Sequence, residues 1–304
     1  MTTIFNTVTN LNTTRPELSA YNLIDRNQSL DTYQNPNALP LVFKTSITDP
    51  NPKYTNEDPI NYQNQLANSM GLAGNLLTEV TPYNFTVNNA SSVNSFNNAV
   101  INKRLLLKPA SVNAEIKIKP HHSLYMTVSE QTPVRNISIT ANGVKVKQFT
   151  PFKHPVIVNI GNSDNHTKTI NIKMSTTKQN IWLSNIKFYQ LNQKKLTNWA
   201  RAIKKDSVKI HQINSTHITA QFDQNNSKQI VTSIPYEPGW HATINGQSVK
   251  LHKWANTFMY VNNPNRAKKV EFTYRPQGLI FGIALSVITL IAVVSITVII
   301  NRRY

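Results

Sequence analysis

The chain has 304 residues, with 32 lysines and arginines against 14 aspartates and glutamates and a formal net charge of +18. It contains no cysteine, which excludes disulfide bonds, thiolate metal sites and thiol nucleophiles. The positive charge favours a polyanionic partner, which is nucleic acid, anionic lipid or a phosphate-rich wall polymer, and composition alone does not choose among them.

Residues 1–75 are predicted to form an irregular, mixed segment with one short helix. Asn-Pro and Asp-Pro-Asn-Pro sequences at 35–36 and 49–52 interrupt any long element. Residues 59–70 place apolar side chains on one helical face. Asp58 is suited to cap the start of this helix and Gly71 to end it.

Residues 76–192 change to a period of two and are predicted to form a β-sandwich module. Apolar and polar residues alternate over 114–119 and 124–128, as half-buried strands require. A further alternating pair of strands meets at Asn142-Gly143, which predicts a type I′ hairpin because both residues accept positive φ. Several short strands at this spacing are typical of an antiparallel β-sandwich.

Residues 193–206 are predicted to form a short amphipathic linker helix. Apolar residues recur at i, i+3, i+4 and i+7, beginning at Leu196 and including Trp199. The apolar stripe can lie on a membrane surface or pack on a neighbouring sheet. Packing on a sheet is the favoured interpretation.

Residues 207–277 are predicted to form a second β module. A strand beginning at Trp240 leads into a second Asn-Gly turn at Asn245-Gly246, and alternating strands follow it. The interval between hairpin and following strand is similar in the two modules. A structural duplication is one explanation, but a hairpin followed by two strands is too common to establish it.

Residues 278–300 form an uncharged apolar run, followed by a short tail at 301–304. At about 1.5 Å per residue this run makes roughly 34 Å of helix, enough to cross a hydrocarbon core of about 30 Å. We therefore predict a transmembrane helix. The expected fold class is mainly β, with antiparallel β-sandwich modules, an amphipathic linker helix and one C-terminal membrane span.

The orientation of this span does not follow from charge. Basic residues flank it on both sides: Arg266, Lys268, Lys269 and Arg275 before it, and Arg302 and Arg303 after it. Residues 1–14 are rich in Asn and Thr and lack the basic and apolar regions of a signal peptide. Two interpretations follow: a tail-anchored protein with its bulk in the cytoplasm, or a piece of a longer protein that other spans export.

No catalytic, metal or cofactor site is predicted. The adjacent pair Glu57-Asp58 is better explained by helix capping than by acid–base catalysis. His121 and His122 are adjacent on a predicted strand, so their side chains would point to opposite faces and would not share a metal. The sequence holds no phosphate-binding glycine loop. Basic residues are spread without an arginine-rich block, which argues against nucleic-acid binding.

Aromatic residues gather in the second β module and give two interpretations. Trp and Tyr faces on a β-sandwich stack on sugar rings, so Tyr236, Trp240 and Trp254 are predicted carbohydrate-binding residues. Core packing is the alternative, and the residues alone favour it for a tryptophan beside a hairpin.

A resemblance to a known family rests mainly on residues 233–249, which read Ser-Ile-Pro-Tyr-Glu-Pro-Gly-Trp-His-Ala-Thr-Ile-Asn-Gly-Gln-Ser-Val. Phe258 and the sequence Val-Glu-Phe-Thr-Tyr-Arg-Pro at 270–276 follow, and the chain then enters the apolar run. In order and spacing this resembles the C-terminus of the YfhO family of bacterial membrane proteins. Residues 35–41 and 58–65 resemble segments by which that family leaves its membrane domain and enters its extracytoplasmic domain.

The resemblance implies a function. Family members are similar to GT-C glycosyltransferases, in which a multi-span domain uses a polyprenyl-phosphate-linked sugar, and the implied role is decoration of lipoteichoic acid or related Gram-positive cell-wall polymers. It also implies that the bulk of this chain is extracytoplasmic and that its last residues are cytoplasmic. The N-terminal spans and the loop that carries the catalytic acid in such enzymes are absent, so no catalytic residue carries over.

The expected role is therefore that of an extracytoplasmic β-domain and a single-pass anchor in the cell membrane. Its expected partners are the lipid bilayer, an anionic wall polymer such as lipoteichoic acid, and a multi-span membrane domain encoded upstream. The alternative is a stand-alone, membrane-anchored protein that binds wall polymer or carbohydrate. No nucleic-acid partner is expected.

Overall fold

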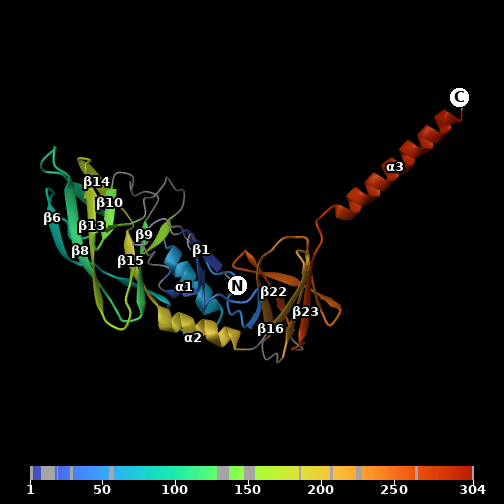
Figure 1. The fold of residues 1–304 in the computed structure, drawn as a ribbon, viewed down its shortest axis with the longest axis horizontal. Coiled ribbons are helices and arrows are strands. Elements are labelled where there is room, and N and C mark those ends of the chain that lie inside the picture. The colour runs from blue at the N-terminus through green and yellow to red at the C-terminus, as the bar shows by residue number, and fades with distance from the viewer. Residues whose placement is uncertain are drawn as a thin grey trace. The chain divides into compact units, whose positions relative to one another are not determined.

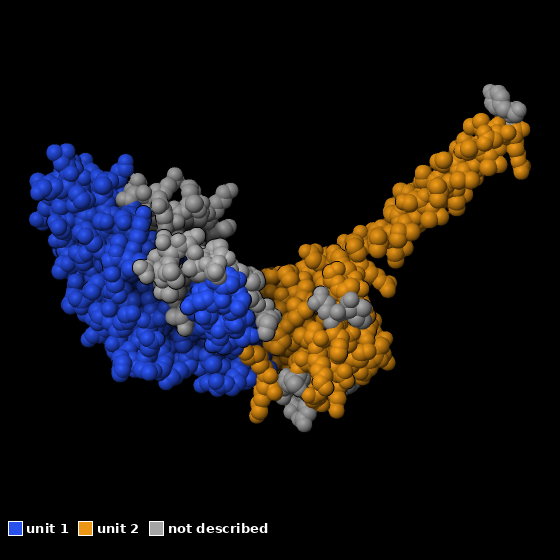
Figure 2. Space-filling model, in the orientation of Figure 1, with its two compact units in different colours: residues 1–39, 47–203 blue, residues 40–46, 204–304 orange. Residues whose placement is uncertain are grey.

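The computed structural model describes residues 3–7, 18, 20–27, 30–54, 58–128, 137–146, 155–184, 186–205, 208–223, 228–263 and 266–302. This part of the chain is mainly β, with antiparallel sheets and three helices (Figure 1). It divides into two compact units, residues 1–39 with 47–203 and residues 40–46 with 204–304 (Figure 2). The mainly β fold class is thus confirmed.

Unit 1 contains most of the strands. They are β1 (Thr3–Thr7), β2 (Asn22–Arg26), β3 (Leu30–Gln34), β5 (Leu77–Val80), β6 (Tyr83–Asn88), β7 (Ala99–Asn102), β8 (Ala110–Ile118), β9 (His122–Val128), β10 (Ile137–Ala141), β11 (Val144–Lys145), β12 (Val156–Asn162), β13 (Lys168–Thr176), β14 (Asn180–Leu183) and β15 (Lys187–Asn192). Its helices are α1 (Pro59–Ser69) and α2 (Gln193–Lys204).

The centre of unit 1 is a β-sandwich. A five-stranded sheet of order β11-β10-β13-β8-β6 and a four-stranded sheet of order β12-β9-β15-β5 share one hydrophobic core. Ile116 and Ile172 from the first sheet and Met126 and Phe188 from the second are fully or almost fully buried in it. The predicted alternation is the cause, because every second residue of β8 and β13 points into this core.

The two helices of unit 1 follow their sequence signals. Asn61 N donates to Asp58 Oδ1 at 2.8 Å, so Asp58 caps α1 as predicted. In α2, Leu196 and Trp199 pack against a buried cluster that includes Ile60 and Tyr189. This cluster includes residues of β5 and β15, so the interpretation that α2 packs on a neighbouring sheet is confirmed.

Unit 2 holds two more antiparallel sheets. Its strands are β4 (Val42–Thr45), β16 (Val208–Asn214), β17 (His217–Phe222), β18 (Gln229–Pro235), β19 (Trp240–Ile244), β20 (Gln247–Val249), β21 (Leu251–Trp254), β22 (Phe258–Asn262) and β23 (Lys269–Tyr274). The sheet orders are β16-β17-β23-β19-β20 and β21-β22-β18-β4. Phe222, Ile230, Val261 and Phe272 belong to the core of this unit.

Strand β4 comes from the N-terminal part of the chain and pairs with β18 in unit 2. Its register joins Val42 to Thr232 and Thr45 to Gln229. Val42 is fully buried and belongs to the core of unit 2. The sequence did not predict this strand, because four residues are too short to show a period and the partner lies far along the chain.

Both predicted Asn-Gly hairpins are confirmed. Asn142 and Gly143 have φ of 49° and 79°, and Asn245 and Gly246 have φ of 50° and 81°. Each pair joins two strands whose flanking residues are direct partners, Ala141 with Val144 and Ile244 with Gln247. Positive φ at both central residues is the type I′ geometry, which matches the twist of the strands.

Helix α3 (Leu279–Asn301) is long and apolar enough to cross a membrane, with a hydropathy of 2.9 and no buried residue. Its hydroxyl groups are satisfied within the helix: Ser286 donates to Gly282 O at 2.8 Å and Thr297 to Val293 O at 2.9 Å. Such internal pairing is what lipid requires of polar groups.

The hairpin geometry predicts the effect of one substitution. Gly143 has positive φ, and a Cβ there would meet nothing within 4 Å, so only backbone strain opposes a side chain. We expect Gly143→Ala to lower the free energy of unfolding by about 1 kcal/mol, measured by urea denaturation. The exposed neighbour Val144→Ala is the control and should change it by less than about 0.5 kcal/mol. Equal stabilities for both variants would contradict the turn assignment.

Candidate functional site

The three predicted carbohydrate-binding residues lie in unit 2 but in different surroundings. Trp240 begins β19 in the five-stranded sheet, whereas Trp254 ends β21 in the four-stranded sheet. Tyr236 follows directly after β18. The two tryptophans, which are 14 positions apart in the sequence, therefore lie on two separate sheets.

Trp240 is half-buried and packs against the core of unit 2. Its ring centroid lies 5.3 Å from that of Tyr274, which is also its cross-strand partner. The preceding Gly239 allows this approach, because a Cβ there would lie 2.4 Å from the backbone oxygen of Arg275. Trp240 therefore packs against the core and remains partly accessible to solvent.

Trp254 is buried, with 5% of its surface exposed, and its ring centroid lies 5.6 Å from that of Phe258. On the same two strands His252 stacks on Tyr260 at 5.1 Å. Both contacts join cross-strand partners, so they form one aromatic row along β21 and β22. We assign Trp254 to this row, where it stabilises the sheet.

Tyr236 is half-buried and carries a cation over its ring. The ammonium nitrogen of the exposed Lys253 lies 4.4 Å from the ring centroid, within the range of a cation–π contact. The backbone holds the tyrosine in place, since Tyr236 N donates to Thr257 O at 2.6 Å. Sequence reasoning missed Lys253, whose position opposite Tyr236 depends on the β21–β22 hairpin. The carbohydrate-binding role of the three aromatic residues stays a prediction.

The turn that joins β21 and β22 was also missed. Ala255 and Asn256 have φ of 54° and 53°, and Thr257 N donates to Trp254 O at 3.1 Å. An alanine is seldom found in the left-handed region, because its Cβ is crowded there. Asn256 accepts this conformation, but Ala255 gives no turn signal, so the pair was not recognised although the turn positions both Lys253 and Trp254.

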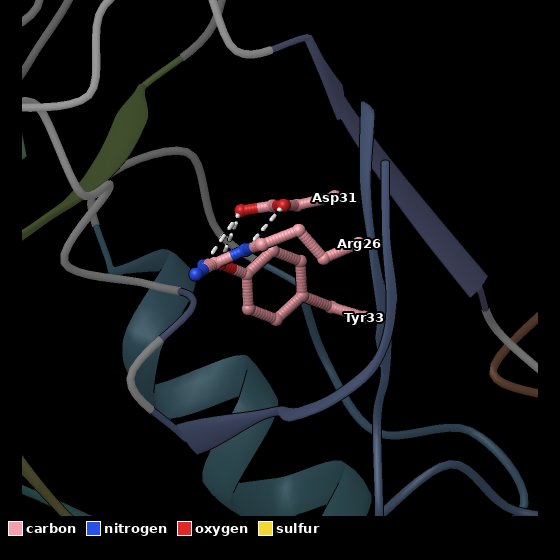
Figure 3. Close-up of polar contacts among 3 residues, drawn as sticks. All are labelled: Arg26, Asp31 and Tyr33. Carbon is pink, nitrogen blue, oxygen red and sulfur yellow. Dashed lines mark hydrogen bonds and ion pairs between the residues drawn. The ribbon is translucent and has the colours of Figure 1, made fainter. Parts of the chain in front are cut away.

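The polar cluster of Arg26, Asp31 and Tyr33 lies in the small sheet β1-β3-β2 of unit 1 (Figure 3). Arg26 donates from Nε to Asp31 Oδ1 at 2.9 Å and from Nη2 to Asp31 Oδ2 at 3.1 Å. Tyr33 Oη donates to Asp31 Oδ2 at 3.4 Å. The hydrogen bond from Arg26 is the main reason why the pKa of Asp31 is lowered.

This cluster fastens a hairpin. Arg26 and Asp31 are cross-strand partners on β2 and β3. Asp31 is buried, while the side chain of Arg26 is 64% exposed. A carboxylate held this way is an ionised acceptor with little capacity to exchange protons near neutral pH. We assign it a structural role.

The residues considered for acid–base or metal chemistry are placed as follows. Asp58 caps α1, and Glu57 lies outside the described residues. His121 is in a turn with φ of 56°, and β9 begins at His122, so the premise that both lie on one strand was wrong. Among the described residues no group of three or more His, Cys, Asp or Glu side chains could hold a metal ion.

The described residues form a mainly β protein with one C-terminal helix that is long and apolar enough to cross a membrane. The family model described as "Bacterial membrane protein YfhO" matches residues 1–286, which covers both β units and the first residues of α3. The chain therefore belongs to the YfhO family of bacterial membrane proteins.

Comparison with an individual family member shows low sequence identity. "Uncharacterized protein YfhO" of Bacillus subtilis (strain 168) is 26% identical over 127 residues, which cover 42% of this chain and 15% of that protein. Among solved structures, the match to Ruminococcus gnavus β-glucuronidase covers 58% of this chain and 34% of the glucuronidase chain. The sequence identity is 10% and the TM-score is 0.24. The match to a GH2 β-galacturonidase from Eisenbergiella tayi covers 66% of this chain and 37% of the galacturonidase chain, with 7% identity and a TM-score of 0.24. A TM-score this low does not establish a shared fold with either enzyme.

The Arg26–Asp31 pair predicts a dependence of stability on pH. Because the folded-state pKa of Asp31 is lowered, its stabilising effect is present above the unfolded carboxyl pKa of about 4 and is lost as pH falls through the folded value. We expect the difference in unfolding free energy between wild type and Asp31→Asn to be largest at neutral pH and to shrink on acidification. Urea denaturation across this pH range measures it.

The control for this measurement is Asp25→Asn, which changes an exposed aspartate on the same strand as Arg26. Its difference from wild type should stay small at neutral pH. A stability difference for Asp31→Asn that does not vary with pH would show that the Arg26–Asp31 contact does not form in solution.

Proposed function

We propose that this chain is the extracytoplasmic β-domain and terminal anchor of a YfhO-like glycosyltransferase that uses a polyprenyl-phosphate-linked sugar. The observation that carries the proposal is the family match, which extends through both β units into α3. In this role the chain binds the acceptor or supports a membrane domain, and the transfer of the sugar takes place in that membrane domain. The acceptor we propose is lipoteichoic acid or a related anionic wall polymer.

Charge supports an anionic acceptor. Removing the two arginines of the tail from the total of +18 leaves +16 on residues 1–277. A polymer of sugar or polyol phosphates offers both a negative backbone and ring faces. The Lys253–Tyr236 pair presents the matching groups, an exposed ammonium beside an aromatic ring.

The acceptor role predicts how binding responds to salt. We expect the full chain in detergent to bind lipoteichoic acid weakly and to release it as salt rises, because exposed charges are screened beyond about 8 Å at physiological ionic strength. DNA, as an unrelated polyanion, should behave alike. Titration at low and high salt measures both affinities. Absence of binding to lipoteichoic acid at low salt would remove the acceptor-binding role.

Variants separate charge from sugar stacking in the same titration. Trp240→Ala and Tyr236→Ala test the two half-buried rings, with circular dichroism to confirm folding. Trp254→Ala removes a buried ring and is expected to destabilise unit 2 by about 3–5 kcal/mol, so it reports on stability. Salt-resistant binding that Trp240→Ala abolishes without unfolding would show an aromatic sugar site and overturn the purely electrostatic expectation.

The proposed orientation places residues 1–277 outside the cell. Because the chain has no cysteine, a single introduced cysteine can be labelled uniquely. In intact cells of the native host, a membrane-impermeant maleimide should react with Ser248→Cys, at an exposed position on β20. Arg302→Cys, beyond the other end of α3, should react only after permeabilisation. The reverse pattern would contradict the extracytoplasmic assignment.

The alternative is a stand-alone, membrane-anchored protein that binds wall polymer. The same charge of residues 1–277 supports it, so polymer titration does not separate the two functions. Purification of the full chain from native membranes does: a multi-span domain that co-purifies supports the glycosyltransferase assembly. A chain that purifies without one and still binds polymer supports the alternative.

A further inference from the structure

Three consecutive leucines protrude from the β-sandwich of unit 1. They lie in the loop between β7 and β8, and we call residues 105–107 the leucine tip. Leu105, Leu106 and Leu107 are 57%, 65% and 100% exposed. A run of three exposed leucines is unfavourable in water and marks an interaction site when the fold holds it in place.

The fold does hold the leucine tip in place. The side chain of Asn89 accepts a hydrogen bond from Leu105 N at 2.7 Å. It donates to Lys108 O at 2.7 Å and to Leu105 O at 3.0 Å. The backbone adds a bond from Arg104 N to Asn89 O at 3.1 Å. One asparagine thus braces both ends of the loop and keeps the leucines directed away from the sandwich.

Basic residues flank the tip, and an exposed tryptophan lies on the strand that adjoins its base. Arg104 and Lys108 flank it in sequence, and both are exposed. Lys103 N donates to Gln179 O at 2.8 Å, which brings the start of β14 to the base of the loop. On β14, Trp182 is 50% exposed and pairs across the strands with Val100, which is 44% exposed. Exposed leucines with flanking cations, and an exposed tryptophan on the adjoining β7–β14 ladder, match the composition of a membrane-interface surface.

We propose that the leucine tip inserts into the surface of a bilayer that carries anionic lipid, with Arg104 and Lys108 at the headgroup phosphates. The exposed leucines can enter the apolar part of the bilayer surface, and the positive charges of Arg104 and Lys108 attract the negative headgroups. Helix α3 holds the same chain on a membrane, so the tip acts at high effective concentration and a weak contact suffices. This attachment is independent of the proposed glycosyltransferase role.

The experiment uses the full chain reconstituted through α3 into vesicles that contain phosphatidylglycerol. Leu106→Cys receives an environment-sensitive fluorophore, and the lipids carry a quencher in their acyl chains. Val144→Cys, an exposed apolar position (68%) at the β10–β11 hairpin, is the matched control. We expect the label at 106 to be quenched on the order of threefold more strongly than the label at 144, because only the tip enters the lipid.

Two further variants test the two parts of the tip in the Leu106→Cys background. Replacing Leu105 and Leu107 by serine removes apolar surface, and Arg104→Gln with Lys108→Gln removes charge. Each change should reduce the quenching to the level of the label at 144. In vesicles of phosphatidylcholine alone the unmodified tip should lose most of its quenching. Circular dichroism confirms that every variant is folded.

Three outcomes would overturn the proposal. A label at 106 that stays in water in both kinds of vesicle shows that the tip does not enter lipid. Equal quenching at 106 and 144 shows general contact of the domain with the membrane. A change at 106 that depends on protein density and is independent of anionic lipid shows that a second copy of the chain covers the leucines.

Discussion

The apolar surface of α3 is the constraint on which the rest of this structure depends. All of its described side chains are exposed, and a helix of hydropathy 2.9 favours lipid over water as its surroundings. Once α3 is in a membrane, it tethers the rest of the chain to the bilayer. Contacts that would be too weak for a freely diffusing protein then become effective.

Confinement gives a common explanation for the surface features of the two units. A charge of +16 on residues 1–277 suits weak, repeated contact with the polyanionic polymer that we propose as the acceptor. The half-buried Trp240 and the Lys253–Tyr236 pair offer partly exposed aromatic groups to the same polymer. The leucine tip adds the contact with lipid that we propose. These features fit the role that we propose, a domain that holds and positions other molecules at a membrane.

Local signals made much of the fold predictable. The Asn-Gly pairs, the Asp58 cap and the apolar stripe of α2 depend on neighbours within a few residues, and the structure confirms each of them. Strand β4 was missed because its pairing with β18 is long-range. The aromatic residues were identified from the sequence, but their separation onto two sheets depends on strand order, which local patterns do not contain. The leucine tip was missed because exposure also depends on tertiary structure.

The central claim is that α3 embeds the chain in a bilayer, and alkaline carbonate extraction of native membranes tests it most directly. The chain should remain in the membrane pellet with a known integral protein. Leu290→Arg with Ile291→Arg places two charges near the middle of α3, at about 2.5–3.5 kcal/mol each, and should move the chain to the supernatant. Release of the unmodified chain by carbonate would contradict the account.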